Sequence, residues 1–358
     1  MKELVCKVFL LFIVLGFSQS LSAKEFKRDT THRFDIAKNG VVQLSNIYGK
    51  IDVQTWTSNK VKIQVIIKVN ARNQSDANDI FDTIDLEFSE HNNQVIANTI
   101  IKAKKYHMDY SIDYEVFMPR SCSLKLQNRY GNSEVTEIGG DAIVNVKYGN
   151  IQFKKVNKNL DIDLKYGNCK VDKASNTEIK SEHAFFDLKE VKHINLVTRY
   201  SKVNLRKADK IKCDTRNDTY KVGTVNTFNN FGRYDDLNIK EVQYLDVQSE
   251  YSDLFIGKLE NRADIKMKYG GVTLDYVSPN FYEITLDGSE TDFKIQVGEN
   301  AAYRLQVTGR FCPILVPDLV KMIEHEDNQN QEKIRGYLGY NAPRVIKANM
   351  KSGSFKLK

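Results

Sequence analysis

The 358-residue sequence is poor in the side chains that usually build metal centres and disulfide frameworks. It has five cysteines and six histidines. The cysteines show no C-x-x-C spacing and the histidines are scattered, so no zinc site is predicted. Gly-x-Ser-x-Gly, a phosphate-binding loop and a paired acid/base signature are all missing. We therefore expect no catalytic residue, metal or cofactor, and predict that the protein is not an enzyme.

Long apolar runs are absent after the first 23 residues. The opening segment has Lys2 and Lys7, an apolar run over residues 8–17, and small residues at its end. This pattern predicts a secretory signal peptide, cleaved after Ser22 or Ala23. The run is short for a membrane span, which leaves a retained anchor as the alternative. Cys6 lies too early for a lipidation site. We expect an exported protein, in the periplasm or at the cell surface, with no transmembrane segment in the mature chain.

A basic patch of the kind that binds nucleic acid is also missing. The net charge of +7 is modest for this length, and Lys and Arg alternate with Asp and Glu. The densest basic spot, at Lys102, Lys104 and Lys105, lacks length and interleaved aromatics, which favours a solvated strand end. No nucleic-acid partner is predicted.

What the sequence does have is an internal repeat. Tyr-Gly occurs at Tyr130, Tyr148, Tyr166 and Tyr269. Measured from Tyr130, the successive steps are 18, 18, 17, 17, 17, 17, 17, 18 and 18 residues. A fixed period of this kind is typical of a stacked repeat protein. The intervening and final positions of the series are His183-Ala184, Tyr200-Ser201, Asn217-Asp218, Tyr234-Asp235, Tyr251-Ser252 and Asp287-Gly288.

The residues around each anchor alternate between apolar and polar. Leu160, Ile162 and Leu164 precede Tyr166, and Cys169 and Val171 follow it. Period-two alternation predicts strands with one buried face. One repeat, here called a rung, is thus a strand, a tight turn at the aromatic-Gly pair, a second strand, and an apolar corner eight residues past the anchor. Glycine suits the turn because positive φ costs it little. Since one rung cannot bury its apolar face alone, rungs must stack, and ten would form a rod on the order of 45 Å long.

Both ends of the repeat carry additional elements. Tyr48-Gly49, followed by Ile51, Val53 and Trp56, predicts a first rung near residues 41–56. Strands are expected near 61–69, 84–88, 94–101 and 110–118, with a short helix over 74–81 that has Ser75 as N-cap. At the other end, residues 346–357 predict a last rung with its turn at Ser352-Gly353. An insertion near 309–345 is expected to hold a short helix at 317–326.

Three stretches carry a family resemblance: Ile47 to Val53 (Ile-Tyr-Gly-Lys-Ile-Asp-Val), Tyr114 to Pro119 (Tyr-Glu-Val-Phe-Met-Pro), and the repeated Tyr-Gly-x-x-x-Val units. Over residues 35–358 the chain resembles the bacterial putative-adhesin family of exported β-strand-repeat proteins. The resemblance implies an all-β fold, a right-handed single-chain β-helix or β-solenoid, and no catalytic residues. The chain departs from the pattern between Asn217 and Tyr234, where Asn230 and Gly232 take core-facing positions. Left-handed hexapeptide solenoids do not fit the apolar offsets.

The predicted organisation has four parts. Residues 1–23 are the signal peptide, and 24–118 form an N-terminal β region with the first rung and inserted strands. Residues 119–298 carry the 17–18-residue rungs, and 299–358 supply C-terminal rungs and a cap with an insertion.

The most visible candidate site is the row of aromatic anchors. It can be interpreted as an outer platform for sugars or peptides, or, as their parity with the buried residues favours, as a structural corner stack with hydroxyls reaching solvent. His183 takes this position once and is expected to be a packed residue. The candidate binding residues are Tyr130, Tyr148, Tyr166, Tyr200, Tyr234, Tyr251 and Tyr269.

Two further groups are expected to be structural. The outward residues Asp161, Asp163, Lys165 and Lys170 could line a lyase groove, but a solvated sheet face is favoured. Cys169 and Cys213 fall about three rungs apart, roughly 12–15 Å at the strand spacing. Because a disulfide needs Cα atoms within about 7 Å, free buried thiols are predicted.

The sequence favours a non-enzymatic exported scaffold that binds an extended macromolecule, either a glycan or another component of the cell envelope. Two alternatives stay open. One is a glycan-active β-helix enzyme, a lyase or hydrolase. The other is a structural or regulatory envelope protein with a protein partner. The ligand and the oligomeric state are not predicted.

Overall fold

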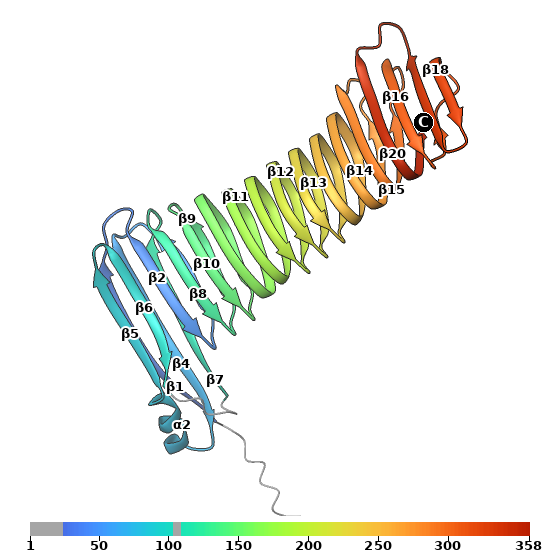
Figure 1. Ribbon diagram of the computed structural model, residues 1–358. Coiled ribbons are helices and arrows are strands. Elements are labelled where there is room, and N and C mark those ends of the chain that lie inside the picture. Colours follow the sequence, from blue (N-terminus) through green and yellow to red (C-terminus); the bar gives the residue numbers. More distant parts are fainter. Residues whose placement is uncertain (1–23, 103–108) are drawn as a thin grey trace, which may run out of the picture.

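The computed structural model describes residues 24–102 and 109–358. The predicted signal peptide, together with Lys104, Lys105 and His107, lies outside these residues. The described residues form one large sheet of twenty strands and one short helix (Figure 1). The prediction of an all-β fold is confirmed. No helix in this part of the chain has the length and apolar character needed to span a membrane.

The N-terminal strands pack as a mixed arrangement beside the first rung. Antiparallel pairs join β1 to β4, β4 to β7, and β5 to β6. Parallel pairs join β2 to β6 and β3 to β7. The expected strands are all present, although β1 had not been predicted. The bounds are β1 (Lys24–Asp35), β2 (Val41–Ile47), β3 (Ile51–Trp56), β4 (Lys60–Ala71), β5 (Ile84–His91), β6 (Gln94–Ile101) and β7 (Asp109–Pro119).

The only helix in the described residues is α2 (Gln74–Phe81), at the predicted position. Its predicted N-cap is wrong. Asn73 has extended backbone, and its side-chain oxygen accepts a hydrogen bond from the Asp76 N–H at 2.9 Å. Ser75 is already inside the helix, where its hydroxyl cannot cap the first turn. Ala77, Ile80 and Phe81 are the buried residues of the helix.

The central strands lie parallel to one another, each beside the segment that follows it by one rung. Ala142 pairs with both Leu124 and Leu160, and Phe186 pairs with Val203. These offsets are 18 and 17 residues. Figure 1 shows the resulting stack of coils. The bounds are β8 (Ser123–Arg129), β9 (Ser133–Ile138), β10 (Ala142–Lys147), β11 (Ile151–Arg199), β12 (Lys202–Arg216), β13 (Thr219–Arg233), β14 (Asp236–Val277) and β15 (Glu283–Val297).

The first rung joins this stack across a long excursion of the chain. Val42 pairs with Leu124, and Val53 pairs with Val135, both in parallel register. The 82-residue offset contains β4, β5, β6, β7 and α2. Strands β2 and β3 thus lie between the N-terminal strands and the central stack.

The series of anchors does not continue at Asp287-Gly288, as predicted. Met267 pairs with Gly288 and Gly270 pairs with Thr291, so the turn falls at Glu290, whose φ is 51°. The reason lies in the corner before β15. Arg262 pairs with Glu283, an offset of 21 residues, because residues 278–282 form an extra bend that buries Phe281.

The C-terminal strands close the stack in a changed order. Strand β20 runs parallel between β15 and β16, and Phe355 pairs with Phe293. Strand β19 then adds antiparallel to β16, and β18 adds antiparallel to β19. The bounds are β16 (Tyr303–Arg310), β17 (Ile314–Leu315), β18 (Lys321–Asn328), β19 (Gln331–Leu338) and β20 (Arg344–Leu357).

The helix predicted at 317–326 is wrong, because most of this segment belongs to β18. Glu324 forms ion pairs across the hairpin with Lys333 at 2.5 Å and Arg335 at 3.0 Å. Cross-strand pairing with β19 outweighs the weak local preference for helix. His325 consequently lies on a strand, 3.1 Å from the Glu332 carboxylate, and not in a loop.

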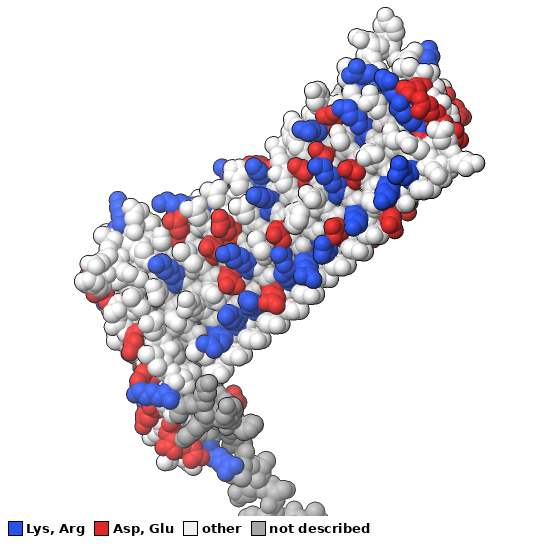
Figure 2. Space-filling view, in the orientation of Figure 1, with Lys and Arg blue, Asp and Glu red and all other residues white. Residues whose placement is uncertain are grey.

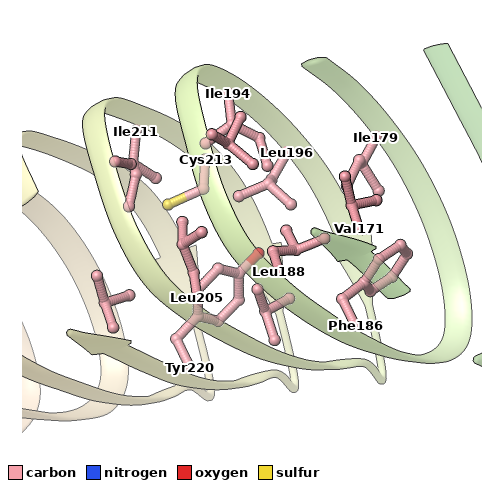
Figure 3. Close-up of a cluster of buried hydrophobic side chains, with 14 of the residues drawn as sticks. Val171, Ile179, Phe186, Leu188, Ile194, Leu196, Leu205, Ile211, Cys213 and Tyr220 are labelled. Atoms are coloured by element: carbon pink, nitrogen blue, oxygen red, sulfur yellow. The ribbon is translucent and has the colours of Figure 1, made fainter. Parts of the chain in front are cut away.

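The core is a continuous column of inward side chains from successive rungs (Figure 3). Leu188, Leu205 and Cys213 point into the space between the strands. Cys169 and Cys213 are both free and buried. Burial raises the pKa of the Cys213 thiol to about 12. Asn230 and Gly232 are buried as their positions in the repeat predicted. The Asn230 amide donates to Thr215 Oγ1 at 2.8 Å, which supplies the polar partner that a buried amide needs.

Candidate binding edge

The tight turn of each rung places its aromatic residue, and not its glycine, at positive φ. The φ values of the aromatic anchors from Tyr48 to Tyr269 lie between 51° and 64°. The glycine has a different role from the one expected. A β-carbon on Gly149 would lie 2.1 Å from the carbonyl oxygen of Gly131 in the preceding rung. Glycine is therefore required there by the close approach of two backbones.

The aromatic side chains of successive turns stack on one another, and we call this row the aromatic ladder. From Tyr48 to Tyr200, neighbouring ring centroids are 5.0–5.2 Å apart with interplanar angles of 4–13°. A second stack joins Tyr234, Tyr251 and Tyr269 at 5.0 and 4.7 Å. Asn217 interrupts the row between the two stacks. His183 packs between the rings of Tyr166 and Tyr200, as its position in the repeat predicted.

The ladder exposes ring edges and hydroxyl groups to solvent. Tyr148 is 50% exposed and Tyr200 is 52% exposed. Within each stack the ring faces cover one another. Both earlier interpretations are thus partly right, since the ladder is a corner stack whose outer edge faces solvent. All seven predicted tyrosines belong to it. Tyr48 belongs to it too, although the chain excursion hid its place beside Tyr130.

A row of basic residues accompanies the ladder, and sequence reasoning missed it. One residue precedes each ladder position, and parallel register aligns these residues, as for Arg129, Lys147 and Lys165. Figure 2 shows basic side chains along the edge of the stack where β8 and β10 end. Glu182 and Glu250 interrupt the row. The signal was the Lys or Arg just before most anchors. We call this row the basic column: Arg129, Lys147, Lys165, Arg199, Arg216, Arg233 and Lys268.

Only part of the basic column is neutralised by ion pairs. Lys165 contacts Glu182 at 3.0 Å, Arg199 contacts Asp214 at 2.8 Å, and Arg233 contacts Glu250 at 2.6 Å. Within the described residues, no carboxylate lies within ion-pair distance of the other four. These are Arg129, Lys147, Arg216 and Lys268, and the Lys268 ammonium sits 5.2 Å from the Tyr269 ring centroid.

Two hollows lie along this edge. One, of about 330 Å³, is lined by Ser45, Asn46, Ile47, Gln127, Asn128, Arg129, Asn145 and Lys147. It therefore contains two cations without an ion-pair partner in the described chain. The other, an open hollow of about 540 Å³, follows the opposite side of the ladder and reaches Asn217. It is lined by Gly167, Asn168, His183, Ala184, Phe185, Tyr200, Ser201, Lys202, Asn217 and Thr219.

Asparagine side chains hold successive turns together beside the ladder. The Asn132 side-chain oxygen accepts from the Asn150 N–H at 3.0 Å and from its side-chain amide at 3.1 Å. Asn150 repeats this arrangement with Asn168 at 2.9 and 2.8 Å. These bonds fix the spacing of the turns from which the ladder projects.

A buried polar array lies beneath the interruption of the ladder. The Asp218 carboxylate accepts from the Ser201 N–H at 2.6 Å and from Thr198 Oγ1 at 2.7 Å. Asp235 accepts from the Asp218 N–H at 2.9 Å and from Thr215 Oγ1 at 2.6 Å. Burial, only partly offset by these bonds, raises the pKa of Asp235 to about 6.

The outward charges considered for a lyase groove are not gathered into one. Asp161 is exposed, and Lys170 lies beyond the turn, on the second strand of the same rung. Partial burial, together with Glu178, raises the pKa of Asp161. Across residues 24–102 and 109–358, no three His, Cys, Asp or Glu side chains are grouped as a metal site would need.

No family model matches the chain, and no curated protein matches it. Several solved structures are similar at low identity. A "putative cell adhesion protein" from Clostridium sporogenes is 10% identical, with 93% of this chain and 99% of that chain covered and a TM-score of 0.21. A "putative adhesin" from Parabacteroides distasonis is 10% identical, with 75% and 93% covered and a TM-score of 0.33. A "putative lipid binding protein" from the same organism is 10% identical, with 75% and 93% covered and a TM-score of 0.28. These names describe those proteins, and the similarity is too low to extend them to this chain.

Proposed function

We propose that the protein is an exported, non-enzymatic β-solenoid that binds an extended macromolecule along its ladder edge. The solenoid is right-handed, with rungs of 17–18 residues over 119–298. Residues 24–118 and 299–358 cap it, and residues 1–23 direct export. The bound macromolecule is a glycan of the cell envelope or of another surface.

One observation carries this proposal. The aromatic ladder and the basic column run side by side, each repeating once per rung, with ring centroids about 5 Å apart. A linear polymer made of repeating polar units can contact such a row at many successive points. Phenol hydroxyls both donate and accept hydrogen bonds, and the basic side chains donate them. Many weak contacts in register add up to useful affinity.

The rigidity of the stack supports the same conclusion. The contact groups project from strands that are hydrogen-bonded on both sides and fixed further by the asparagine bonds described above. A preorganised row loses little entropy on binding, which favours recognition of a long ligand by many small contacts.

A broad polysaccharide panel tests the proposal. Each immobilised polymer is incubated with the protein and scored for retained protein and for released products. Retention without products is the expected result. Released oligosaccharides would contradict the non-enzymatic assignment, and the outward Asp161 and Asp163 would then be the first residues to examine. Absence of retention on every polymer would contradict glycan binding.

A further inference from the structure

The interruption of the ladder at Asn217 leaves a gap between two aromatic faces. Asn217 keeps the backbone of a ladder turn, with φ of 56° and an N–H that donates to the Arg233 carbonyl at 3.0 Å. The stack is therefore regular here, and only the ring is missing. At a strand spacing of about 4.8 Å, Tyr200 and Tyr234 are separated by roughly 10 Å. We call this gap, with Asn217 at its base, the Asn217 slot.

The width of the slot suits one inserted ring. Carbon atoms in contact lie about 3.5–4.0 Å apart, so a ring between two aromatic faces needs roughly 7–8 Å, and a puckered ring slightly more. Elsewhere in each stack the ring faces are covered by their neighbours. At the slot, the faces of Tyr200 and Tyr234 that point toward Asn217 have no ladder ring against them. Tyr200 is correspondingly the most exposed tyrosine of the ladder.

The charge around the slot is basic. Arg216 immediately precedes Asn217, is exposed, and has no ion-pair partner in the described chain. Arg199 and Arg233 align with it on either side, each already paired with one carboxylate. On the opposite side of the ladder, Lys202 and Thr219 line the hollow that ends at the slot. A free guanidinium recognises a planar carboxylate through two parallel hydrogen bonds.

We propose that the Asn217 slot binds one carboxylated sugar residue of an acidic polysaccharide. The sugar ring lies between Tyr200 and Tyr234, and its carboxylate contacts the Arg216 guanidinium. This assignment rests on the proposed function and names its substrate class. Single-stranded nucleic acid is less suited, because successive bases need successive open ring faces and the ladder offers them only here.

The test uses polygalacturonate and its fully methyl-esterified form, which share a backbone and differ in charge. Wild-type protein is expected to be retained more strongly by the acid form. Arg216→Gln should weaken that retention by about tenfold, as expected for loss of a charged hydrogen bond, and leave the ester unaffected. Arg304→Gln removes an exposed arginine of the C-terminal strands and is the matched control.

A second variant fills the slot without disturbing the fold. Asn217→Tyr places in the gap the residue that the other ladder turns hold at the same φ, so it should stack with Tyr200 and Tyr234 and abolish the preference for the acid form. Asn300→Tyr introduces the same residue at a positive-φ turn off the ladder (φ 63°) and should change nothing.

The outcomes separate the two proposals. Unchanged retention of Asn217→Tyr, combined with loss on changing ladder tyrosines to alanine, would overturn the slot assignment and leave the proposed function standing. Equal retention by acid and ester, or by neither, would overturn the acidic-sugar assignment, while the wider panel still tests glycan binding. Slot-dependent binding of oligo-dT without binding of polygalacturonate would overturn it in favour of nucleic acid.

Discussion

At the scale of single residues, Gly149 shows how closely successive turns approach. Its absent side chain leaves room for the Gly131 carbonyl, and an added β-carbon would lie 2.1 Å from that oxygen. Gly149→Ala should lower the free energy of unfolding by about 1–3 kcal/mol, because backbone must move to relieve the clash. Chemical denaturation measures this. Gly271→Ala is the matched control, since its nearest atom is a flexible Asp253 side-chain oxygen at 3.1 Å. Equal losses in the two variants would contradict the close-approach explanation.

Asp235 is a second residue with a measurable consequence. Its folded pKa, raised by burial to about 6, lies above the ordinary value of 3.8. Its protonated form therefore favours the folded state, and this contribution is present below pH 3.8 and lost as pH rises through about 6. Asp235→Asn should remove this dependence. Comparing wild type and variant between pH 4.5 and 7, we expect the difference in unfolding free energy to change by on the order of 1–2 kcal/mol. A constant difference would show that Asp235 is not perturbed.

At the scale of elements, the asparagine bonds beside the ladder are expected to stabilise the spacing of the turns. Asn150→Ala removes side-chain bonds to both Asn132 and Asn168. The loss should be about 1 kcal/mol, since these groups are solvent-exposed. Asn238→Ala is the control, because this exposed outward asparagine makes no side-chain hydrogen bond in the described structure. Thermal unfolding measures both variants, and an equal effect would mean that the bonds between turns add nothing.

The elements also show what the sequence could and could not predict. Strands and the anchor turns followed from period-two alternation and a regular spacing, because each rung repeats the same burial pattern. The turn at Glu290 could not be placed this way, since the bend over residues 278–282 adds three residues without changing the alternation. The helix expected at 317–326 failed because pairing with β19 is not a local signal.

The candidate site was predictable in part for a related reason. The ladder tyrosines mark themselves by spacing, whereas the basic column becomes visible only when residues 17 or 18 apart are aligned. Arg129 and Lys147 then lie side by side. Along the chain, the same residues look like ordinary alternating charge. The Asn217 slot needs the stacked rings on both sides to be recognised at all.

At the scale of the whole molecule, the outer edge of β18 leaves backbone groups unpaired, and its charges are expected to prevent association. Glu326 and Asp327 are exposed on this last strand. Glu326→Val with Asp327→Val should cause concentration-dependent association, measured by sedimentation velocity, because a neutral apolar edge pairs with other edges. Glu178→Val with Asp246→Val makes the same change on strands that are paired on both sides, and should stay unassociated. Association of both double variants would point to hydrophobic surface alone.

The central claim is that the ladder edge is the binding surface, and one measurement addresses it directly. Retention on the polysaccharides that hold the wild-type protein is compared between Tyr148→Ala with Tyr166→Ala, on the ladder, and Tyr244→Ala with Tyr282→Ala, which are exposed off it. Both double variants must give the wild-type circular dichroism spectrum. Loss of retention in the ladder variant alone is the predicted result. Full retention in the ladder variant, or equal loss in both, would contradict the account.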